Sequence, residues 1–535
     1  MRDKLTKLIW YAAAIIIIAL IVQACETYYF RSNYTNANKL LHETKNLETK
    51  PFLKAHLKNG DVFILYDKWQ VDTIKNCVTG NGVRYDFNRQ KKFEGNLSIV
   101  ADSVAIYETN TKIENTETGR IAILGILAGV DVVVGIICLT VPKACFGSCP
   151  TFYINENDNF HYADAEGFSN AIAPSLEYGD IDALNNKHLT GDTFSITMKN
   201  EALETHCVND VKLFAYPRNA NERVYQTRQN DFYLCENTYR VTKAIGNEGD
   251  ITTLLKNDDK LERFSLADEN NLKTREQVYL TYDNIENINN LGLIVSFRQT
   301  LLTTYLIYSA MGYMGDQVGD IFASIERKKY KEETISSVYK ELGDIDVYVW
   351  DDKKGIWDFQ GGWNETGPIA FNHQMLPLKD ISSKKTVKIK LVMNKGLWRL
   401  DYLALTNIRK KVTPIELSPD QILNKGKIDP KALSSIIDPR KYLISMPGSM
   451  YKFNFTLPEK NQDFELFLYS KGYYLEWMRA HWIKDKDLLA LKQMMENPKK
   501  YLEKETKSYK KYETQMEQEF WNSKIDTQIF SYYEN

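Results

Sequence analysis

The 535-residue sequence lacks the short motifs that identify common catalytic and nucleotide-binding sites. It contains no H-E-x-x-H zinc motif, no G-x-S-x-G nucleophile motif, no Walker loop and no glycine-rich dinucleotide motif after a strand. Its 7 histidines are scattered, and no two stand four residues apart, as a pair of metal ligands on one helix face would. These absences predict no cofactor and no metal site, and they favour a binding protein over an enzyme. Carboxylates are plentiful, so a glycosidase pair stays an unsupported alternative.

The chain also lacks an excess of charge of one sign. The formal net charge is −2, which provides no electrostatic surface for nucleic acid, and we expect no nucleic-acid partner. Proline is scarce, at 14 residues, and 43% of the residues are hydrophobic, which indicates folded domains rather than disorder. The 33 tyrosines favour sheet-rich domains with partly wet surfaces. The length exceeds what one hydrophobic core normally organises.

The N-terminus has the pattern of an export signal. Basic residues precede an apolar run from Leu8 to Val22, and Ala24 then stands before Cys25. This pattern resembles the lipobox of bacterial lipoproteins, and the resemblance implies that Cys25 is acylated and becomes the mature N-terminus. An uncleaved transmembrane anchor is the alternative, because Leu8 to Ala24 is just long enough to span a bilayer. Both interpretations predict a membrane partner and a chain outside the cytoplasm.

Six cysteines remain once Cys25 is set aside. An even number in an exported chain predicts disulfides, and we expect Cys145 to pair with Cys149 and Cys207 with Cys235. The spacing of Cys145 and Cys149 is C-x3-C, which differs from the C-x-x-C spacing of thiol-disulfide enzymes. A structural disulfide is therefore favoured here over a redox pair.

The local patterns predict a multidomain, mainly β protein with helical insertions. In order, we expect a signal peptide with lipobox or an anchor (1–25), a tether (26–50), a small β domain (51–118), a hydrophobic segment (119–142), a β-rich domain carrying the CFGSCP motif (143–285), a helical pair (286–335), a jelly-roll-like β-sandwich (336–475) and charged C-terminal helices (476–535). Residues 121–141 are long enough to span a membrane, but Asp131 near their middle favours a buried or interfacial hairpin.

One stretch resembles a known group. KACFGSCPTFY at residues 143–153, with residues 165–169, 174–177 and 200–206, resembles uncharacterised Bacteroidota envelope lipoproteins that share a C-F-G-x-C-P core. The resemblance implies residence in the cell envelope as an outer-membrane lipoprotein, on either the periplasmic or the surface side. It supplies no catalytic residues.

Residues 345–405 contain the best-defined β pattern, which resembles a galactose-binding-like β-sandwich. Trp357, Trp363, Asn364 and Glu365 follow one another within an aromatic, glycine-rich stretch that we expect to be a loop. Indole rings pack on the C–H faces of sugars, and amide and carboxylate groups bond sugar hydroxyls, so these residues are candidate ligand-binding residues. The alternative is that both tryptophans belong to the hydrophobic core.

Together these features predict a lipid-anchored envelope protein that acts as a binding or scaffold subunit of an outer-membrane assembly, with an envelope protein as partner. Two other functions stay open. One is a glycan-binding or glycan-processing accessory protein that uses the tryptophan-bearing module. The other is a thiol-disulfide component centred on Cys145 and Cys149.

Overall fold

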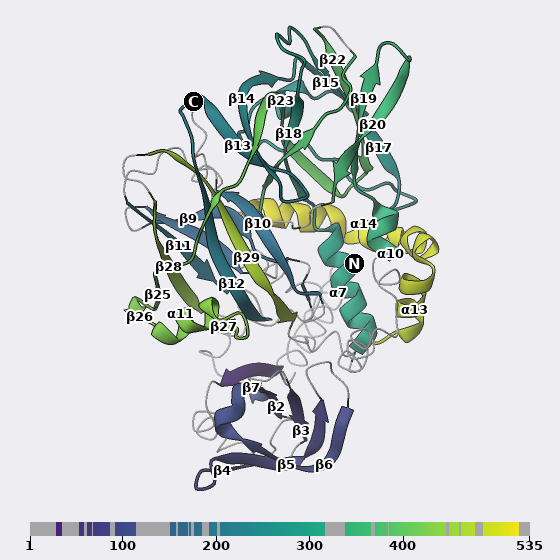
Figure 1. Ribbon diagram of the computed structural model, residues 1–535. Coiled ribbons are helices and arrows are strands. Elements are labelled where there is room, and N and C mark those ends of the chain that lie inside the picture. Colours follow the sequence, from purple (N-terminus) through teal and green to yellow (C-terminus); the bar gives the residue numbers. More distant parts are fainter. Residues whose placement is uncertain are drawn as a thin grey trace, which may run out of the picture. The chain divides into compact units, whose positions relative to one another are not determined.

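The computed structural model describes residues 28–34, 53–57, 61–66, 68–85, 91–113, 150–156, 159–169, 171–172, 176–184, 192–200, 204–315, 337–364, 367, 370–382, 385–445, 449–458, 462–476 and 485–523. The prediction of a mainly β, multidomain protein with helical insertions is confirmed by its sheets and helices (Figure 1). The chain divides into two compact units, Met1–Ile137 and Cys138–Asn535.

The first unit is built on an antiparallel sheet. Its strands are β1 (Tyr28–Tyr34), β2 (Leu53–Leu57), β3 (Val62–Leu65), β4 (Gln70–Asp72), β5 (Cys77–Tyr85), β6 (Lys91–Val100) and β7 (Val104–Ile113), in the order β1-β7-β2-β3-β5-β4 with β6 beside β5. Trp69 and Tyr107 fill its core. Gly82 is required where β5 pairs with β3, because a Cβ at this position would lie 2.0 Å from the Ile64 carbonyl oxygen. Strand β1 lies in the range that the sequence predicted to be a tether.

The second unit begins with a β-sandwich. One sheet has the order β26-β25-β28-β11-β8-β9, and the other has the order β10-β29-β12-β24, with β27 beside β12. Phe194, Leu213, Phe453 and Leu466 come from both sheets and share one core. The strands are β8 (Thr151–Glu156), β9 (Asn159–Glu166), β10 (Tyr178–Leu184), β11 (Thr193–Lys199), β12 (Glu204–Pro217), β24 (Ile415–Leu417), β25 (Gln421–Asn424), β26 (Lys427–Ile428), β27 (Leu443–Ser445), β28 (Met450–Thr456) and β29 (Phe464–Glu476). Helix α11 (Pro430–Ile437) packs against this core.

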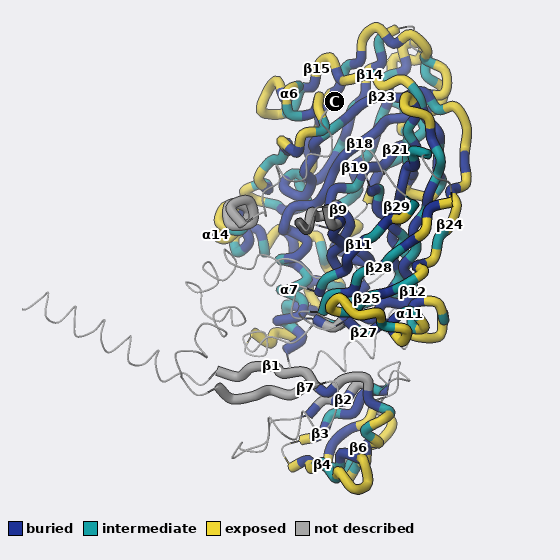
Figure 2. Tube along the Cα trace, turned by 90° about the vertical axis from the view of Figure 1, so that its left-hand side faces the viewer, coloured by how far each residue is buried: buried dark blue, intermediate teal, exposed yellow. Residues whose placement is uncertain are grey.

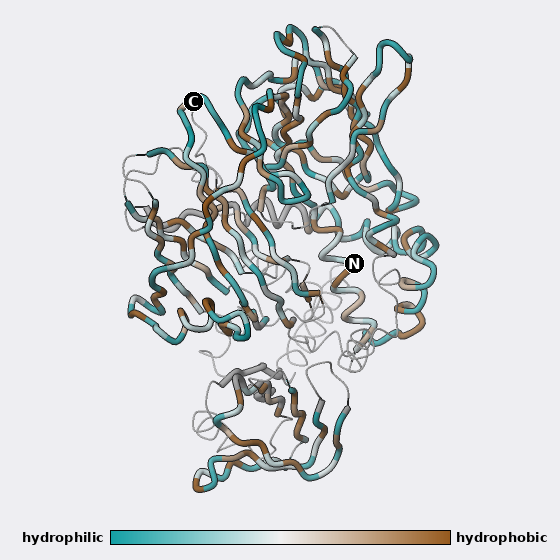
Figure 3. The backbone as a smooth tube through the Cα atoms, in the orientation of Figure 1, coloured by the Kyte–Doolittle hydropathy of each residue, from teal (hydrophilic) through white to brown (hydrophobic). Residues whose placement is uncertain are grey.

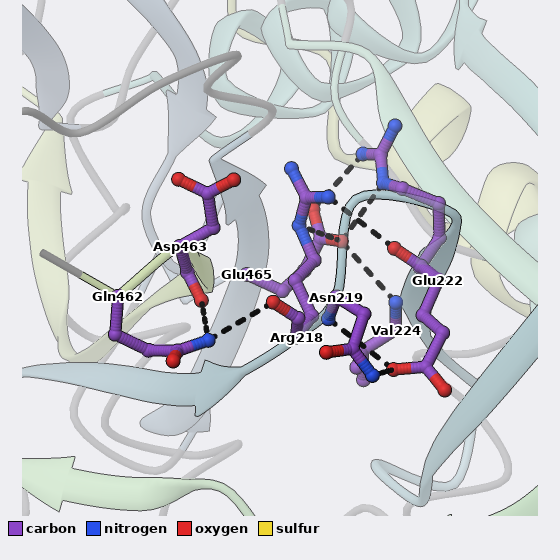
Figure 4. A network of polar contacts seen from close by, with 8 residues as sticks. Arg218, Asn219, Glu222, Val224, Gln462, Asp463 and Glu465 are labelled. Atoms are coloured by element: carbon purple, nitrogen blue, oxygen red, sulfur yellow. Dashed lines mark hydrogen bonds and ion pairs between the residues drawn. The ribbon is translucent and has the colours of Figure 1, made fainter.

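A closed five-stranded barrel packs on the sandwich. It consists of β13 (Glu222–Gln226), β14 (Phe232–Arg240), β23 (Trp398–Val412), β18 (Leu291–Gln299) and β21 (Asn372–Pro377). The rings of Phe232 on the barrel and Phe467 on the sandwich meet edge to face at 4.9 Å. Beside them, buried Glu465 on β29 accepts hydrogen bonds from Arg223 on β13 at 2.8 and 2.9 Å and lies 3.3 Å from Nε of Arg218 (Figure 4). This network ties the barrel to the sandwich.

A further sheet, called the outer sheet below, covers the barrel. Its strands are β15 (Lys243–Gly246), β16 (Gly249–Asp250), β17 (Arg275–Tyr282), β19 (Ile345–Asp351), β20 (Ile356–Trp363) and β22 (Val387–Asn394), in the order β16-β15-β17-β22-β19-β20. One face packs Val278, Val347 and Ile389 into a core shared with Val295 of the barrel. Along β17 and β19, buried positions alternate with more exposed ones. Figure 2 shows how far each residue is buried, and Figure 3 shows its hydropathy. The second face of the outer sheet therefore lies toward solvent.

Five helices complete the described part of the second unit: α6 (Thr252–Leu255), α7 (Leu302–Met314), α10 (Ser337–Leu342), α13 (Leu488–Glu496) and α14 (Pro498–Ser523), with α11 already named. Tyr501, Leu502 and Tyr509 of α14 are buried in the core of the outer sheet. Buried Glu513 accepts a hydrogen bond from the backbone N–H of Ala267 at 2.6 Å. The charged C-terminal helix is thus docked on the sheets along one face.

The sheets cross the domain boundaries expected from the sequence. Strands β10 and β12, expected in the range 143–285, pair with β29, expected in the range 336–475. Residues 345–405 divide between two structures, since β19, β20 and β22 lie in the outer sheet while β21 and most of β23 lie in the barrel. Within the expected helical pair, residues 291–299 form strand β18, every residue of which is buried, and only α7 is described as a helix.

Several expectations lie outside the described residues. These are the N-terminal signal or anchor with Cys25, the hydrophobic segment 119–142, and the CFGSCP motif except for its proline. Among the helices that are described, none is both long and apolar enough to cross a membrane.

Candidate ligand-binding site

The solvent-facing side of the outer sheet holds a cluster of aromatic side chains. We call it the aromatic face; its members are Tyr279 on β17, Tyr348 and Trp350 on β19, and Trp357 and Phe359 on β20. Residues two apart on one strand point to the same side, and the strand pairing places Tyr348 opposite Phe359 and Trp350 opposite Trp357. The register of the sheet therefore gathers aromatic side chains from three strands.

The rings contact one another across the sheet. Trp350 and Trp357 meet edge to face with centroids 5.4 Å apart, and Tyr348 and Phe359 lie 5.4 Å apart. Trp357 also reaches the ring of Tyr279, at 5.8 Å. The ammonium group of Lys390 on β22 lies over two of the rings, 4.7 Å from the centroid of Tyr348 and 5.1 Å from that of Trp357. These contacts hold the rings in fixed positions before any ligand arrives.

The aromatic face is accessible to solvent. Phe359 is 61% exposed, Tyr279 is 42% exposed, and the other three members are half-buried. Cross-strand aromatic pairs stabilise a sheet by about 0.2–1 kcal/mol each, which accounts for part of the cluster. This stabilisation does not explain why Phe359, on the edge strand β20, is largely exposed to solvent. Clustered exposed aromatic surface is typical of a binding site.

The candidate residues predicted from the sequence separate in the structure. Trp357 belongs to the aromatic face, whereas Trp363 is 1% exposed and packs against Phe297 of the barrel, with ring centroids 6.0 Å apart. The stretch that carries them is strand β20 and not a loop. In a regular strand, residues six apart point to the same side, but a β-bulge between Trp357 and Trp363 shifts this alternation by one residue, so the two side chains point to opposite sides. Asn364 is exposed just after β20, and Glu365 lies outside the described residues.

The other members of the aromatic face were missed at the level of sequence, although a signal was present. The alternation in Ile345-Asp-Val-Tyr-Val-Trp350 places Tyr348 and Trp350 on one side of a strand. The contribution of Tyr279 and Lys390 could not be found in this way, because it depends on which distant strands pair.

The predicted disulfide between Cys207 and Cys235 is wrong. Cys235 is a free, buried cysteine on β14 inside the barrel, whereas Cys207 lies on β12 of the sandwich, opposite Tyr473 of β29. The two residues belong to different sheets, which the sequence pattern had joined in one domain. Burial raises the pKa of the Cys235 thiol to about 12, so it is unreactive at neutral pH. Cys145 and Cys149 lie outside the described residues.

A second cluster, of polar and charged side chains, lies at the barrel. Glu262 is buried between two arginines on neighbouring barrel strands: its carboxylate accepts a hydrogen bond from Arg298 at 2.7 Å and one from Arg399 at 3.1 Å. The guanidinium of Arg399 stacks over the ring of Phe264, 3.8 Å from its centroid. Nearby, Ser296 and His373 are hydrogen-bonded at 2.7 Å.

Asp401 adds a perturbed carboxyl to this barrel cluster. Burial raises its pKa to about 10, and the carboxyl of Asp258 beside it acts in the same direction, so Asp401 is protonated at neutral pH. A perturbed acid near charged groups is a feature of many active sites. Here, however, Asp401, Glu262, Arg298 and Arg399 are all buried, and no substrate reaches them in this conformation. We assign the cluster a structural role.

The described residues contain no group of three or more histidine, cysteine, aspartate or glutamate side chains arranged to hold a metal ion. The aromatic face thus remains the candidate site.

Comparison with known proteins identifies no relative. No family model matches the chain, and neither does any curated protein. One weak match among solved structures is BuGH86 in complex with neoagarooctaose, with 8% identity and a TM-score of 0.17; it covers 48% of this chain and 41% of that chain. A variant of the same enzyme matches with 8% identity and a TM-score of 0.17, over 43% of this chain and 34% of that chain. A third match is a β-porphyranase of glycoside hydrolase family 86 from the human gut bacterium Bacteroides plebeius, with 9% identity and a TM-score of 0.16, over 44% of this chain and 37% of that chain. This chain spans less than half the length of those enzymes, and similarity at this level supports no conclusion about fold or function.

Proposed function

We propose that this protein is a lipid-anchored protein of the cell envelope that binds glycans on its aromatic face. The observation that carries the proposal is the set of rings held in place on one solvent-facing side of the outer sheet, with Phe359 and Tyr279 substantially exposed. A binding function fits the chain better than catalysis, because the only strongly perturbed carboxyl described in the barrel is buried.

Glycans suit this surface for a physical reason. A pyranose ring presents a patch of C–H groups, which packs on an indole or phenol ring, and its hydroxyls bond to polar groups at the edge of the patch. The aromatic face supplies the rings, and the Tyr279 hydroxyl, hydrogen-bonded to Gln277, and the Lys390 ammonium supply polar groups beside them. Rings from three strands form a platform longer than one sugar, so an oligosaccharide is the expected ligand.

The envelope location rests on the sequence. The basic start, the apolar run and Ala24-Cys25 are typical of an exported, acylated chain. Acylation at Cys25 would anchor the chain to the membrane. Membership of an outer-membrane assembly is part of the same proposal: affinity purification from detergent-solubilised envelopes should recover a stoichiometric envelope protein, and mass spectrometry of the purified chain should find the acyl group on Cys25. Recovery of an unprocessed chain alone from the cytosol would contradict this part.

Substituting Trp357 with alanine should weaken glycan binding by about tenfold or more, since a well-packed aromatic anchor is worth at least about 1.4 kcal/mol. A glycan array with the wild-type protein identifies the ligand, and calorimetric titration of the Trp357→Ala variant measures the loss. Tyr512→Ala is the matched control, because Tyr512 is an exposed aromatic residue on α14 that is not part of the aromatic face. Unchanged affinity in a folded Trp357→Ala variant, or equal losses in both variants, would contradict the proposal.

A further inference from the structure

The aromatic face carries lysines in a regular arrangement. Across the outer sheet, one row of paired residues runs Tyr279, Lys390, Tyr348 and Phe359. The next row contains Lys243, Thr281 and Lys388 by direct pairing. Trp350 and Trp357 continue this second row, because Trp350 lies two residues after Tyr348 and Lys388 lies two residues before Lys390 on the antiparallel neighbour.

All three lysines point to the same side as the rings. Lys243 and Lys388 are exposed and Lys390 is half-buried, while the residues that alternate with them along the strands, Ala244 and Ile389 among them, are buried in the core. The two rows thus combine five aromatic side chains with three ammonium groups. The ninth residue of the two rows is Thr281, so no carboxylate stands among these nine residues.

Two acidic residues around these rows are paired with cations outside the rows. Asp346, on the same strand as Tyr348, lies 2.9 Å from Arg275, and Asp358 on β20 lies 2.8 Å from Lys354. Asp250 interacts electrostatically with Lys243 of the second row, and Asp283, two residues after Thr281, accepts hydrogen bonds from Thr242 and Thr386. Within the described part of the chain, the contacts of the Lys390 ammonium are with rings, and no carboxylate lies within 4.0 Å of it. The platform therefore has an excess of positive charge beside its rings.

We infer that the ligand of the aromatic face is an acidic oligosaccharide, in which carboxylate or sulfate groups alternate with sugar rings. This inference rests on the proposed function and specifies its ligand class. The rings pack on the sugar faces, and the ammonium groups of Lys388 and Lys390 form charge-assisted hydrogen bonds with the acidic groups. A neutral glycan makes the ring contacts and hydrogen bonds through its hydroxyls but forms no ion pair with the lysines, so the acidic ligand binds more tightly, and added salt reduces the difference.

The test uses the full-length protein and two pairs of probes that differ only in charge. One pair is oligogalacturonate and the same oligosaccharide with its carboxyls reduced; the other is a sulfated galactan oligosaccharide without uronic acid and its desulfated, neutral form. We expect the acidic member of at least one pair to bind about tenfold more tightly than its neutral counterpart at low salt, a difference of the size that one or two charge-assisted contacts provide. In the double variant Lys388→Gln, Lys390→Gln, the affinity for the acidic member should fall to about that for its neutral counterpart, so that this preference is lost.

The matched control replaces two exposed lysines of the helices α13 and α14, Lys492→Gln with Lys504→Gln, and should keep the preference. Equal affinity for acidic and neutral members, unaffected by the Lys388 and Lys390 substitutions, would overturn the inference and leave glycan binding intact. Absence of binding to any saccharide would overturn both proposals. A single-stranded oligonucleotide, whose bases also stack on rings, serves as a competitor; tight binding of it without saccharide binding would overturn the inference in favour of a nucleic-acid ligand.

Discussion

Replacing Glu262 with alanine is expected to lower the free energy of unfolding by about 3–5 kcal/mol. Glu262 is the carboxylate between Arg298 and Arg399, and both arginine side chains are at most 1% exposed. Its removal takes away the carboxylate that two neighbouring buried guanidinium groups share. The cost is thus the loss of a buried counter-charge together with the repulsion between the arginines, and not merely the loss of two hydrogen bonds.

Urea denaturation followed by circular dichroism measures this effect. Glu416→Ala is the matched control: Glu416 forms an ion pair with Lys212 at 3.4 Å, but its side chain is 61% exposed, so its removal should cost less than about 1 kcal/mol. If the Glu262→Ala protein does not fold, Glu262→Gln keeps one acceptor oxygen and should give a folded but weakened protein. Equal stability of Glu262→Ala and Glu416→Ala would show that the barrel cluster is not the buried charge centre described above.

Replacing Asp401 with asparagine is expected to stabilise the protein, increasingly so as the pH rises. In the folded state burial holds the pKa of Asp401 at about 10, whereas an unfolded aspartate has a pKa of about 3.9. Between these values the unfolded chain has lost the proton and the folded chain keeps it, so the contribution of Asp401 to stability decreases as the pH rises. Asparagine has nearly the same shape as the protonated carboxyl and does not ionise.

The two proteins should therefore have similar stability near about pH 4 and diverge above it, by at most about 1.4 kcal/mol per pH unit. We expect a difference of at least about 1 kcal/mol to develop between about pH 5 and about pH 8. Thermal unfolding across this range measures it, with Asp352→Asn, at an exposed aspartate, as control. Parallel pH profiles for wild type and Asp401→Asn would contradict the buried, protonated state.

The general fold could be predicted from local sequence patterns, because short alternating runs with glycine and asparagine turns indicate strands wherever they occur. The arrangement of the strands could not. Strand β29 is the last strand among the described residues, and it pairs with β12, more than two hundred residues earlier. Such a pairing is selected by the complementarity of two apolar faces, which no window of a few residues contains. The domains expected from contiguous ranges therefore differ from the interleaved sheets.

Strand β18 illustrates a second limit of sequence patterns. All nine of its residues are buried, because one side faces the barrel interior and the other the outer sheet. A strand buried on both sides has no polar alternation and is easily taken for part of a helix. The residues of α7 that follow are helical, so the prediction of a helix in this range was correct only from Leu302 onward.

The candidate site was predicted in part. Aromatic and glycine-rich residues near Trp357 directed attention to the correct strand, and the alternative that Trp363 belongs to the core is confirmed. Tyr279 and Lys390 required the fold, since β17 and β22 reach β19 only through long-range pairing. A surface assembled from four strands has no contiguous motif.

Hydroxyl-radical footprinting of the full-length protein, with and without a saturating oligosaccharide chosen on the array, tests the central proposal most directly. We expect Tyr279, Trp357 and Phe359 to be protected from oxidation by the bound ligand, while exposed Tyr512 on α14 is oxidised equally in both samples. Protection confined to other residues while the ligand is bound would contradict the assignment of the aromatic face as the binding surface.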